Sequence, residues 1–199
     1  MHPNPLFRND DRLWLGSLID RVGFGMVFLT TPDGPRVAHM PLLRAGDDRL
    51  RFHLARSNAL TRHLDGARAL VVVNGPDGYV SPRWYDDRAT VPTWDYVTLE
   101  LEGSVRQLAY EELEDLLYRS IEENEDRLGG DRWTAGETPQ PMWDKLAGAI
   151  TGFEMAVEHW RPTLKLSQKK SAPERHRIAE QHAANGNEQL AAMMREVQG

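Results

Sequence analysis

Apolar and polar residues alternate along three stretches of the chain, which is the pattern of β-strands with one buried face. The stretches are residues 50–54, 97–102 and 153–158. In each of them we expect the apolar side chains to point into a core and the polar ones to face solvent. In the last stretch this places Glu154 and Glu158 on the wet face.

A strong hairpin signal lies nearer the N-terminus. Residues 26–29 lead into a Pro-Asp-Gly turn at residues 32–34, and residues 37–43 return from it. Two apolar runs joined by such a turn are typical of antiparallel strands. Residues 69–73 are apolar enough to predict another strand, buried on both faces.

Helical periodicity marks four segments. Asp10 or Asp11 is expected to cap a first helix, residues 58–64 form a short helix, and residues 111–128 form a surface helix with an acidic start. A terminal helix is expected to start at Pro173. The apolar positions of the first and last helices are Leu15, Leu18, Ile19, Val22, Ile178, Leu190, Met193 and Met194.

Successive strands joined by short turns, with a few covering helices, predict an antiparallel β-barrel of mixed α+β class. The 199 residues can bury one sizeable core, and no stretch has the composition of a linker. We therefore expect a single domain over residues 1–199. The start of the chain lacks the features of a signal peptide and no apolar run is of membrane-spanning length, so we expect a cytoplasmic protein.

The composition excludes several classes of function. Cysteine is absent, which rules out disulfides, thiolate metal sites and cysteine nucleophiles. We find no Walker loop, no G-x-S-x-G elbow and no HExxH pair, and no metal-ligand spacing among histidines and carboxylates. The sequence therefore assigns no catalytic residue and no metal, and a cofactor is expected to supply any chemistry.

The charge argues against direct binding of nucleic acid. The chain has 30 acidic and 24 basic residues, for a net charge of −6, whereas duplex binding draws most of its affinity from a basic face. A basic run at residues 165–177 is the exception. It is either a positive patch or a solvated surface, and we favour the second interpretation.

Aromatic residues crowd residues 79–85 and 91–96, although they make up only 8% of the chain. Flat rings, hydroxyl and indole donors, and prolines that stiffen the backbone suit a wall for a planar ligand. An aromatic loop packed on its own barrel explains the same residues equally well. From the residues alone both interpretations stay open.

Short motifs in these and other segments resemble those of the PaiB-type FMN-binding proteins, which are often named negative transcriptional regulators. The matches lie in the same order along nearly the whole chain, which makes the resemblance specific for family and fold. The motifs are HMPL at residues 39–42, FHLARSN at 52–58, YVSPRWY at 79–85, VPTWDY at 91–96, GFE at 152–154 and KLSQ at 165–168.

The resemblance implies an FMN-binding split β-barrel with peripheral helices and a C-terminal helix. It also implies a homodimer with the cofactor at the subunit interface. A flavin-dependent oxidoreductase that acts on an unknown small molecule is the next inference. Two alternatives remain, a haem-binding enzyme similar to piperazate synthases, with His39, His53 or His63 as axial ligand, and a non-enzymatic transcriptional regulator.

The same resemblance implies a set of cofactor-binding residues. A segment at a strand end, residues 56–58, offers a cation, hydroxyl and backbone amides to the phosphate, although Ser57 or Asn58 would also cap the following helix without a ligand. The strand at residues 38–41 is expected to lie along the flavin ring. The set is Ala38, His39, Met40, Pro41, Arg56, Ser57, Asn58, Ser81, Trp84, Tyr85, Lys165, Ser167 and Gln168.

Three places depart from the family pattern: Asp95, Lys169-Lys170 in place of the usual Asn-Arg, and His2 in place of the usual Tyr. Asp95 stands where the family usually has Asn. An ionised carboxylate accepts hydrogen bonds but cannot donate one, so this change bears on the contacts near the cofactor.

Overall fold

A computed structural model describes residues 2–197, and contacts divide the chain into two compact units. The first unit holds the N-terminal residues up to Leu15, Val73–Glu100 and the residues from Arg161 onward. The second unit holds Gly16–Val72 and Leu101–Trp160. A single domain over the whole chain stays a prediction.

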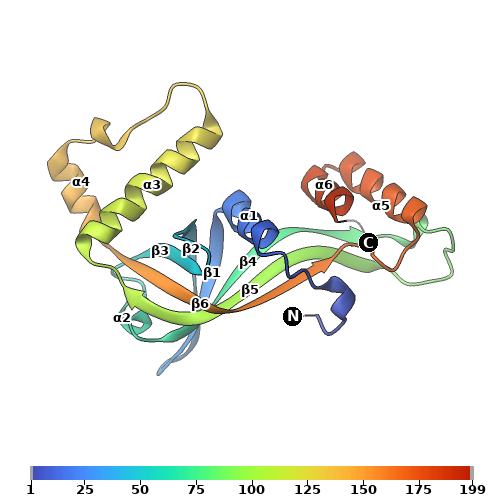
Figure 1. Cartoon of the computed structure of the whole chain (residues 1–199), viewed down its shortest axis with the longest axis horizontal. Helices are drawn as coiled ribbons and strands as arrows, with labels where there is room; N and C mark the ends of the chain where they lie inside the picture. Colours follow the sequence, from blue (N-terminus) through green and yellow to red (C-terminus); the bar gives the residue numbers. More distant parts are fainter. Residues whose placement is uncertain (1, 198–199) are drawn as a thin grey trace. The chain divides into compact units, whose positions relative to one another are not determined.

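Six strands close into a ring in the order β1-β2-β3-β6-β5-β4, so the fold is mixed α/β with an antiparallel sheet (Figure 1). The predicted hairpin is confirmed, because β1 and β2 pair in antiparallel register from Thr31↔Gly34 to Phe24↔Pro41. The strands are β1 Phe24–Thr31, β2 Gly34–Arg44, β3 Arg49–Ala55, β4 Arg68–Val80, β5 Thr93–Gln107 and β6 Ile150–Lys165.

Six α-helices accompany the strands in the described part of the chain. They are α1 Arg12–Val22, α2 Thr61–Leu64, α3 Tyr110–Leu128, α4 Gln140–Ala147, α5 Ala172–Ala184 and α6 Glu188–Glu196. Asp11 caps α1, since its Oδ1 accepts hydrogen bonds from the amides of Leu13 and Trp14. No helix within residues 2–197 combines the length and the apolar content needed to cross a bilayer.

Two helix predictions need correction. The short helix covers only Thr61–Leu64, because the side chain of Asn58 accepts from the amide of Leu60 and forms a turn before the helix. The expected terminal helix is two helices, α5 and α6. Gly186 has a φ of +84° between them, a left-handed conformation that ends α5 and that glycine adopts without steric cost.

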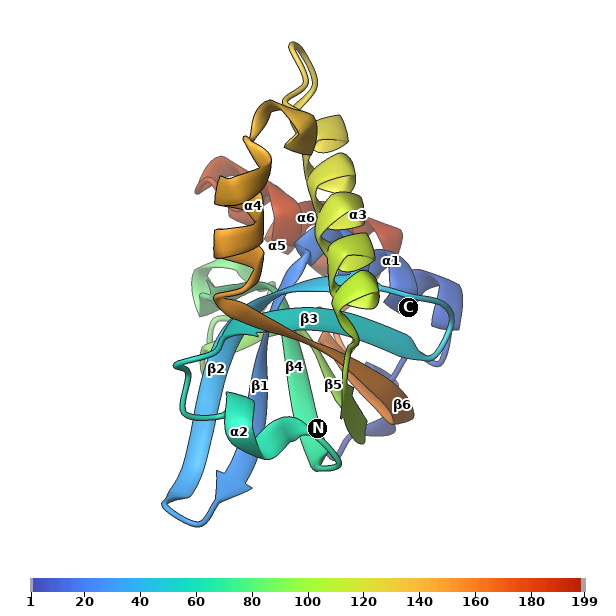
Figure 2. The same ribbon diagram turned by 90° about the vertical axis from the view of Figure 1, so that its left-hand side faces the viewer.

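The core of the second unit follows the predicted alternation on β3, whereas residues 151–155 of β6 are all buried. Leu50, Phe52 and Leu54 are buried, and Phe52 stacks on Phe153 with ring centroids 5.6 Å apart. Outside the ring, α3 packs on the sheet and stands beside α4 (Figure 2). That layer contains the buried residues Leu43, Leu108, Leu113 and Leu116.

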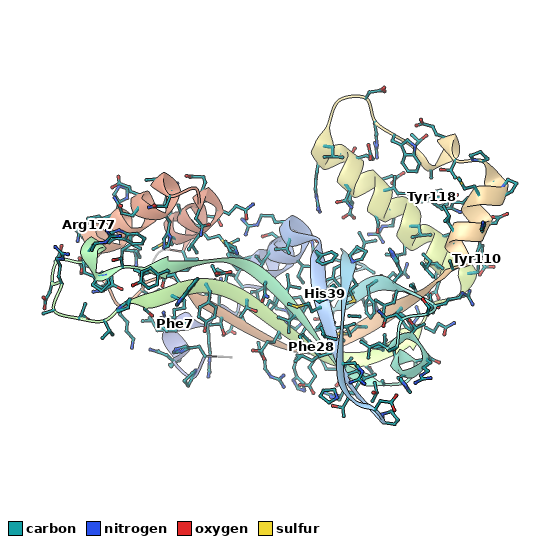
Figure 3. The ribbon with its side chains drawn as sticks, turned by 180° about the vertical axis from the view of Figure 1, so that it is seen from behind. Phe7, Phe28, His39, Tyr110, Tyr118 and Arg177 are labelled. Atoms are coloured by element: carbon teal, nitrogen blue, oxygen red, sulfur yellow. The ribbon has the colours of Figure 1, made fainter. Side chains whose placement is uncertain are left out.

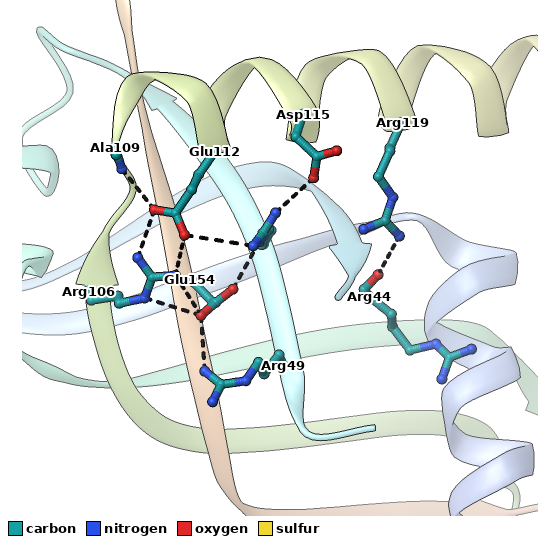
Figure 4. Close-up of polar contacts among 9 residues, drawn as sticks. Arg44, Arg49, Arg106, Ala109, Glu112, Asp115, Arg119 and Glu154 are labelled. Atoms are coloured by element: carbon teal, nitrogen blue, oxygen red, sulfur yellow. Dashed lines mark hydrogen bonds and ion pairs between the residues drawn. The ribbon is translucent and has the colours of Figure 1, made fainter. Parts of the chain in front are cut away.

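Glu154 does not lie on a wet face as predicted, because it is only 3% exposed. Its carboxylate accepts from Arg51 Nε at 2.9 Å, from Arg49 Nη1 at 3.0 Å and from Arg106 Nη2 at 2.9 Å (Figure 4). Arg106 in turn donates to Glu112 of α3 at 2.6 Å. A carboxylate on the outer face of β6 is therefore covered by an ionic network under α3.

This network sets the ionisation of its acids. Burial raises the pKa of Glu154, but hydrogen bonds from Arg51 and Arg106 and their positive charges outweigh it, so the pKa lies below its usual range. The hydrogen bond from Arg106, together with the amide of Ala109, lowers the pKa of Glu112 to about 2. Both groups are thus ionised at neutral pH.

Candidate functional site

A free edge on β2 is the first feature of the candidate site. The ladder between β2 and β3 covers only Leu42↔Phe52, Leu43↔Arg51 and Arg44↔Leu50. Residues 34–41 of β2 pair with β1 on one side, and no strand ladder of the described residues covers their other side. Their outward backbone groups are therefore available to a ligand or a partner chain.

The register brings two predicted segments to this edge. If the β2–β3 ladder continued, residues 38–40 would oppose residues 54–56. The strands part here instead, while β3 keeps its pairing with β6 up to Ala55↔Ile150. The structure thus places the HMPL and FHLARSN motifs opposite one another in the second unit.

The segment after β3 is held by its backbone while two of its side chains stay exposed. The amide of Arg56 donates to Ala149 O at 2.9 Å, and Thr61 Oγ1 donates to Ala55 O at 2.8 Å. Arg56 and Ser57 are exposed, and the described residues offer no hydrogen-bond or ionic partner to either side chain. A positioned cation and hydroxyl without partners fit an anionic group.

Phe28 and His39, labelled in Figure 3, lie on the outward face of β1 and β2. Phe28 pairs with Val37, and Met26 pairs with His39, so these four side chains are neighbours on one face. Phe24 and Val37 are 50% and 46% exposed. His39 is exposed on this face, whereas Ala38 and Met40 point into the core and can offer only backbone groups.

The KLSQ segment lies in the first unit, where its side chains hold one another and the start of β5. Lys165 Nζ donates to Thr93 Oγ1 at 2.6 Å and to the carbonyl of Trp94. Gln168 accepts from the amide of Leu166 at 2.8 Å and donates to the carbonyl of Leu164. These contacts position the segment.

Ser167 and Asp95 form a buried pair in the same unit. Asp95 is fully buried, and its carboxylate accepts from Ser167 Oγ at 2.6 Å and from Ser167 N at 3.1 Å. Ser167 has a φ of +58°, the one left-handed non-glycine residue among residues 2–197. Burial raises the pKa of Asp95 to about 6, against the opposing effects of Ser167 and the Lys165 charge.

The aromatic residues 79–85 also lie in the first unit, where α5 contacts them. Ser81 is buried and its Oγ accepts from the amide of Arg83 at 3.3 Å. The carbonyl of Trp84 accepts from Arg177 Nε at 2.6 Å, and Lys170 Nζ lies 3.5 Å from the centroid of the Tyr85 ring. Two cations of the basic run, Lys170 and Arg177, therefore contact residues of the protein itself.

The sequence reading missed this role of α5. Glu174 and Arg177 are three residues apart, which places them on one side of the helix, and Lys170, just before the helix, pairs with Glu174. A capping box of Ser171 and Glu174 marks the start of that helix. Together these signals indicate an ordered helix surface. The interpretation of residues 165–177 as a solvated surface did not include it.

The predicted site residues thus gather in two groups. Residues 38–41 and 56–58 lie together in the second unit, and Ser81, Trp84, Tyr85, Lys165, Ser167 and Gln168 lie in the first unit. The second-unit group fits FMN, because free backbone groups suit the polar edge of a flavin and an unpaired Arg-Ser segment suits a phosphate. The assignment of each of these residues to the cofactor stays a prediction.

The three histidines proposed for haem differ in their surroundings. His63 Nε2 accepts from Arg62 Nε at 3.0 Å. His53 has a buried Nδ1 without a partner, and burial lowers its pKa. Only His39 is exposed.

Comparison with known proteins identifies the family. Residues 1–159 match the family described as "Putative FMN-binding domain", so the chain belongs to this family and the match supports FMN as its cofactor. The chain is 29% identical over 193 residues to the Protease synthase and sporulation protein PAI 2 of Bacillus subtilis (strain 168). That alignment covers 94% of this chain and 91% of the Bacillus protein. The PaiB-type resemblance is confirmed.

Solved structures share the fold at low identity. The FAD and heme binding protein from Mycobacterium smegmatis is similar with a TM-score of 0.62 and 21% identity, covering 84% of this chain and 77% of that one. The flavocytochrome Anf3 from Azotobacter vinelandii is similar with a TM-score of 0.56 and 16% identity, covering 81% and 74%. At these identities the likeness concerns the fold alone.

Proposed function

We propose that this chain is a PaiB-type split-barrel protein that binds FMN at the free edge of β2. The observation that carries the proposal is the end of the β2–β3 ladder at Leu42↔Phe52, which leaves residues 38–41 opposite the exposed Arg56 and Ser57. Family membership supports FMN, and a protein of like fold that binds FAD and heme supports a flavin site in general.

In this proposal the Arg56 guanidinium and the Ser57 hydroxyl bind the phosphate, and the side-chain Nδ2 of Asn58 adds a donor. The backbone of residues 38–41 lies along the ring system, and His39 lies beside it on the outward face. Ser81, Trp84, Tyr85, Lys165, Ser167 and Gln168 are assigned to the aromatic wall and polar edge by the family resemblance. For Lys165, Ser167 and Gln168, the contacts within the first unit favour a positioning role.

Replacing Arg56 tests the phosphate assignment. We expect Arg56→Ala to weaken FMN binding by about 10- to 100-fold, since a charge-assisted hydrogen bond is worth about 1.5–3 kcal/mol. The variant should keep its melting temperature, because the side chain is exposed and unpaired. Quenching of FMN fluorescence during titration measures the dissociation constant.

Arg62→Ala is the matched control. Arg62 is exposed in the same region and contacts only His63 and Asp33 among the described residues. We expect wild-type FMN affinity for this variant. Equal affinity of Arg56→Ala and wild type would contradict the phosphate site.

A homodimer is the proposed assembly, and the outward face of β1 and β2 is its proposed contact surface. Phe24, Phe28 and Val37 are exposed there together, and large apolar patches of this kind favour association. We expect Phe28→Asp to shift the protein from dimer to monomer, measured by light scattering after size exclusion. Leu128→Asp is the control, because Leu128 is exposed at the end of α3, and a dimer in both variants would contradict this surface.

Oxidoreductase activity is the proposed chemistry. Bound FMN supplies hydride or single-electron transfer through its ring system, and the protein supplies binding and orientation. The expected activity is reduction of the bound flavin by a nicotinamide donor, followed in the visible spectrum without oxygen. A flavin that no donor reduces would favour a non-enzymatic regulator instead.

A further inference from the structure

Polar side chains of helix α5 bind residues 84–86, at the end of the aromatic stretch 79–85. Arg177 donates from Nε to the carbonyl of Trp84 and from Nη2 to Asp86 Oδ1, both at 2.6 Å. Glu174 accepts from the amide of Asp86 at 3.1 Å. Two residues of the helix therefore hold three groups of one short segment, about ninety residues away in the sequence.

An ion pair between Glu174 of α5 and Lys170, just before the helix, supports these contacts. Glu174 accepts from Lys170 at 3.4 Å, and Lys170 lies over the Tyr85 ring. The amide of Asp86 and the Lys170 charge lower the pKa of Glu174. An ionised acid thus lies between two cations, Lys170 just before α5 and Arg177 on it, and each of these groups contacts residues 84–86.

The packing beneath the segment leaves little freedom for other arrangements. The Trp84 ring meets the buried His182 of α5 edge to face, with centroids 5.3 Å apart. A Cβ at Gly78 would lie 2.7 Å from His182 Cε1, so glycine is required on β4 where the helix approaches. Tyr85 is buried. Trp84 and Tyr85 are therefore placed by α5 as well as by the short 3-10 helix Pro82–Trp84, which Tyr85 caps.

We propose that Arg177, together with Lys170 and Glu174, is a positioning residue of the cofactor site. It fixes the Trp84-Tyr85 backbone so that the aromatic wall is ordered before the cofactor binds. This inference rests on the proposed function, which assigns Trp84 and Tyr85 to that wall. Preorganisation of a binding wall increases affinity because less conformational entropy is lost on binding.

The test compares Arg177→Met with Arg175→Met in the full chain. Arg175 lies on the same helix, and its side chain has no hydrogen bond or ion pair with the described residues, which makes it a matched control. Trypsin cleavage after the exposed Arg88 reports whether residues 86–92 are held, and it needs no cofactor. FMN affinity and the circular dichroism of bound flavin report whether the wall is ordered.

We expect Arg177→Met to speed cleavage after Arg88 about tenfold, to weaken FMN binding about tenfold, and to alter the circular dichroism of bound flavin. The reason is that the variant loses two hydrogen bonds, and in one of them, to Asp86, both groups are charged. Arg175→Met should behave as wild type. Arg177→Lys should recover part of each effect, because an ammonium can still donate to Trp84 O or Asp86.

Three outcomes would overturn the inference in different ways. Unchanged cleavage in Arg177→Met would show that α5 does not hold the segment. Faster cleavage with wild-type FMN affinity and circular dichroism would show that the contacts between α5 and residues 84–86 do not affect cofactor binding. A wild-type protein that binds no FMN would overturn the proposed function, and with it the positioning role, whatever the cleavage rates.

Discussion

Glu154→Gln is expected to lower the free energy of unfolding by about 3 kcal/mol, the lower end of the range for breaking a buried ion pair. The lower end applies because two of the three arginines that surround Glu154 are about half exposed. The amide keeps the shape of the side chain but removes the charge and turns N–H donors toward Arg49, Arg51 and Arg106. Urea unfolding at neutral pH, followed by circular dichroism, measures the difference.

Glu158→Gln is the control for this prediction. Glu158 lies on the same strand and pairs with Arg68, but its side chain is 40% exposed, so we expect a loss below about 1 kcal/mol. Similar losses in the two variants would contradict a special role of the buried carboxylate.

The same network predicts a dependence on acid. Its acids have pKa values below their ordinary range in the folded protein. Their stabilisation is complete above the ordinary carboxyl pKa of 4.5 and is lost as the pH falls toward the folded value, about 2 for Glu112.

Asp95→Asn is expected to stabilise the protein at pH 7.5, by up to about 3 kcal/mol for a pKa moved by about two units. The carboxylate has an ordinary pKa of 3.8 and a folded pKa of about 6, so its charge is disfavoured in the folded state. An amide oxygen can still accept from Ser167 N, and its NH₂ can donate to Ser167 Oγ. The buried charge is thereby removed without losing either contact.

The pH dependence identifies the cause. Between pH 3.8 and about 6, folded Asp95 holds a proton that the unfolded chain has released, so stability from this group falls as the pH rises through that window. The advantage of Asp95→Asn should therefore be largest above pH 6 and shrink toward pH 4. Asp77→Asn, at an exposed aspartate of β4, is the control and should change little at any pH. A destabilised Asp95→Asn at pH 7.5 would contradict this account.

Local pattern predicted much of the sheet. The hairpin of β1 and β2 depends on a turn and on strands adjacent in sequence, so its existence could be read from residues 26–43. The alternation of Leu50, Phe52 and Leu54 predicted their burial, because side chains two residues apart share one face of a strand. The break between α5 and α6 also had a local signal in Gly186, which sequence reasoning passed over.

Features set by distant residues could not be read in this way. Glu154 is buried because Arg49 and Arg51, about a hundred residues earlier, reach it from β3. The end of the β2–β3 ladder at Leu42↔Phe52 is a property of how two strands part. Pro41, which has no N–H to donate to a ladder, lies next to it but does not by itself show where the strands part. For the candidate site, family motifs supplied the residues and the structure supplied their arrangement within each unit.

The most direct test of the central claim compares the binding of FMN with that of riboflavin. The visible absorption spectrum of the purified protein is the readout. Riboflavin lacks the phosphate that Arg56 and Ser57 are proposed to bind. We predict a flavin spectrum with FMN, at least tenfold weaker binding of riboflavin, and loss of this preference in Arg56→Ala. Equal binding of the two flavins, or a Soret band with haem and no flavin binding, would contradict the account.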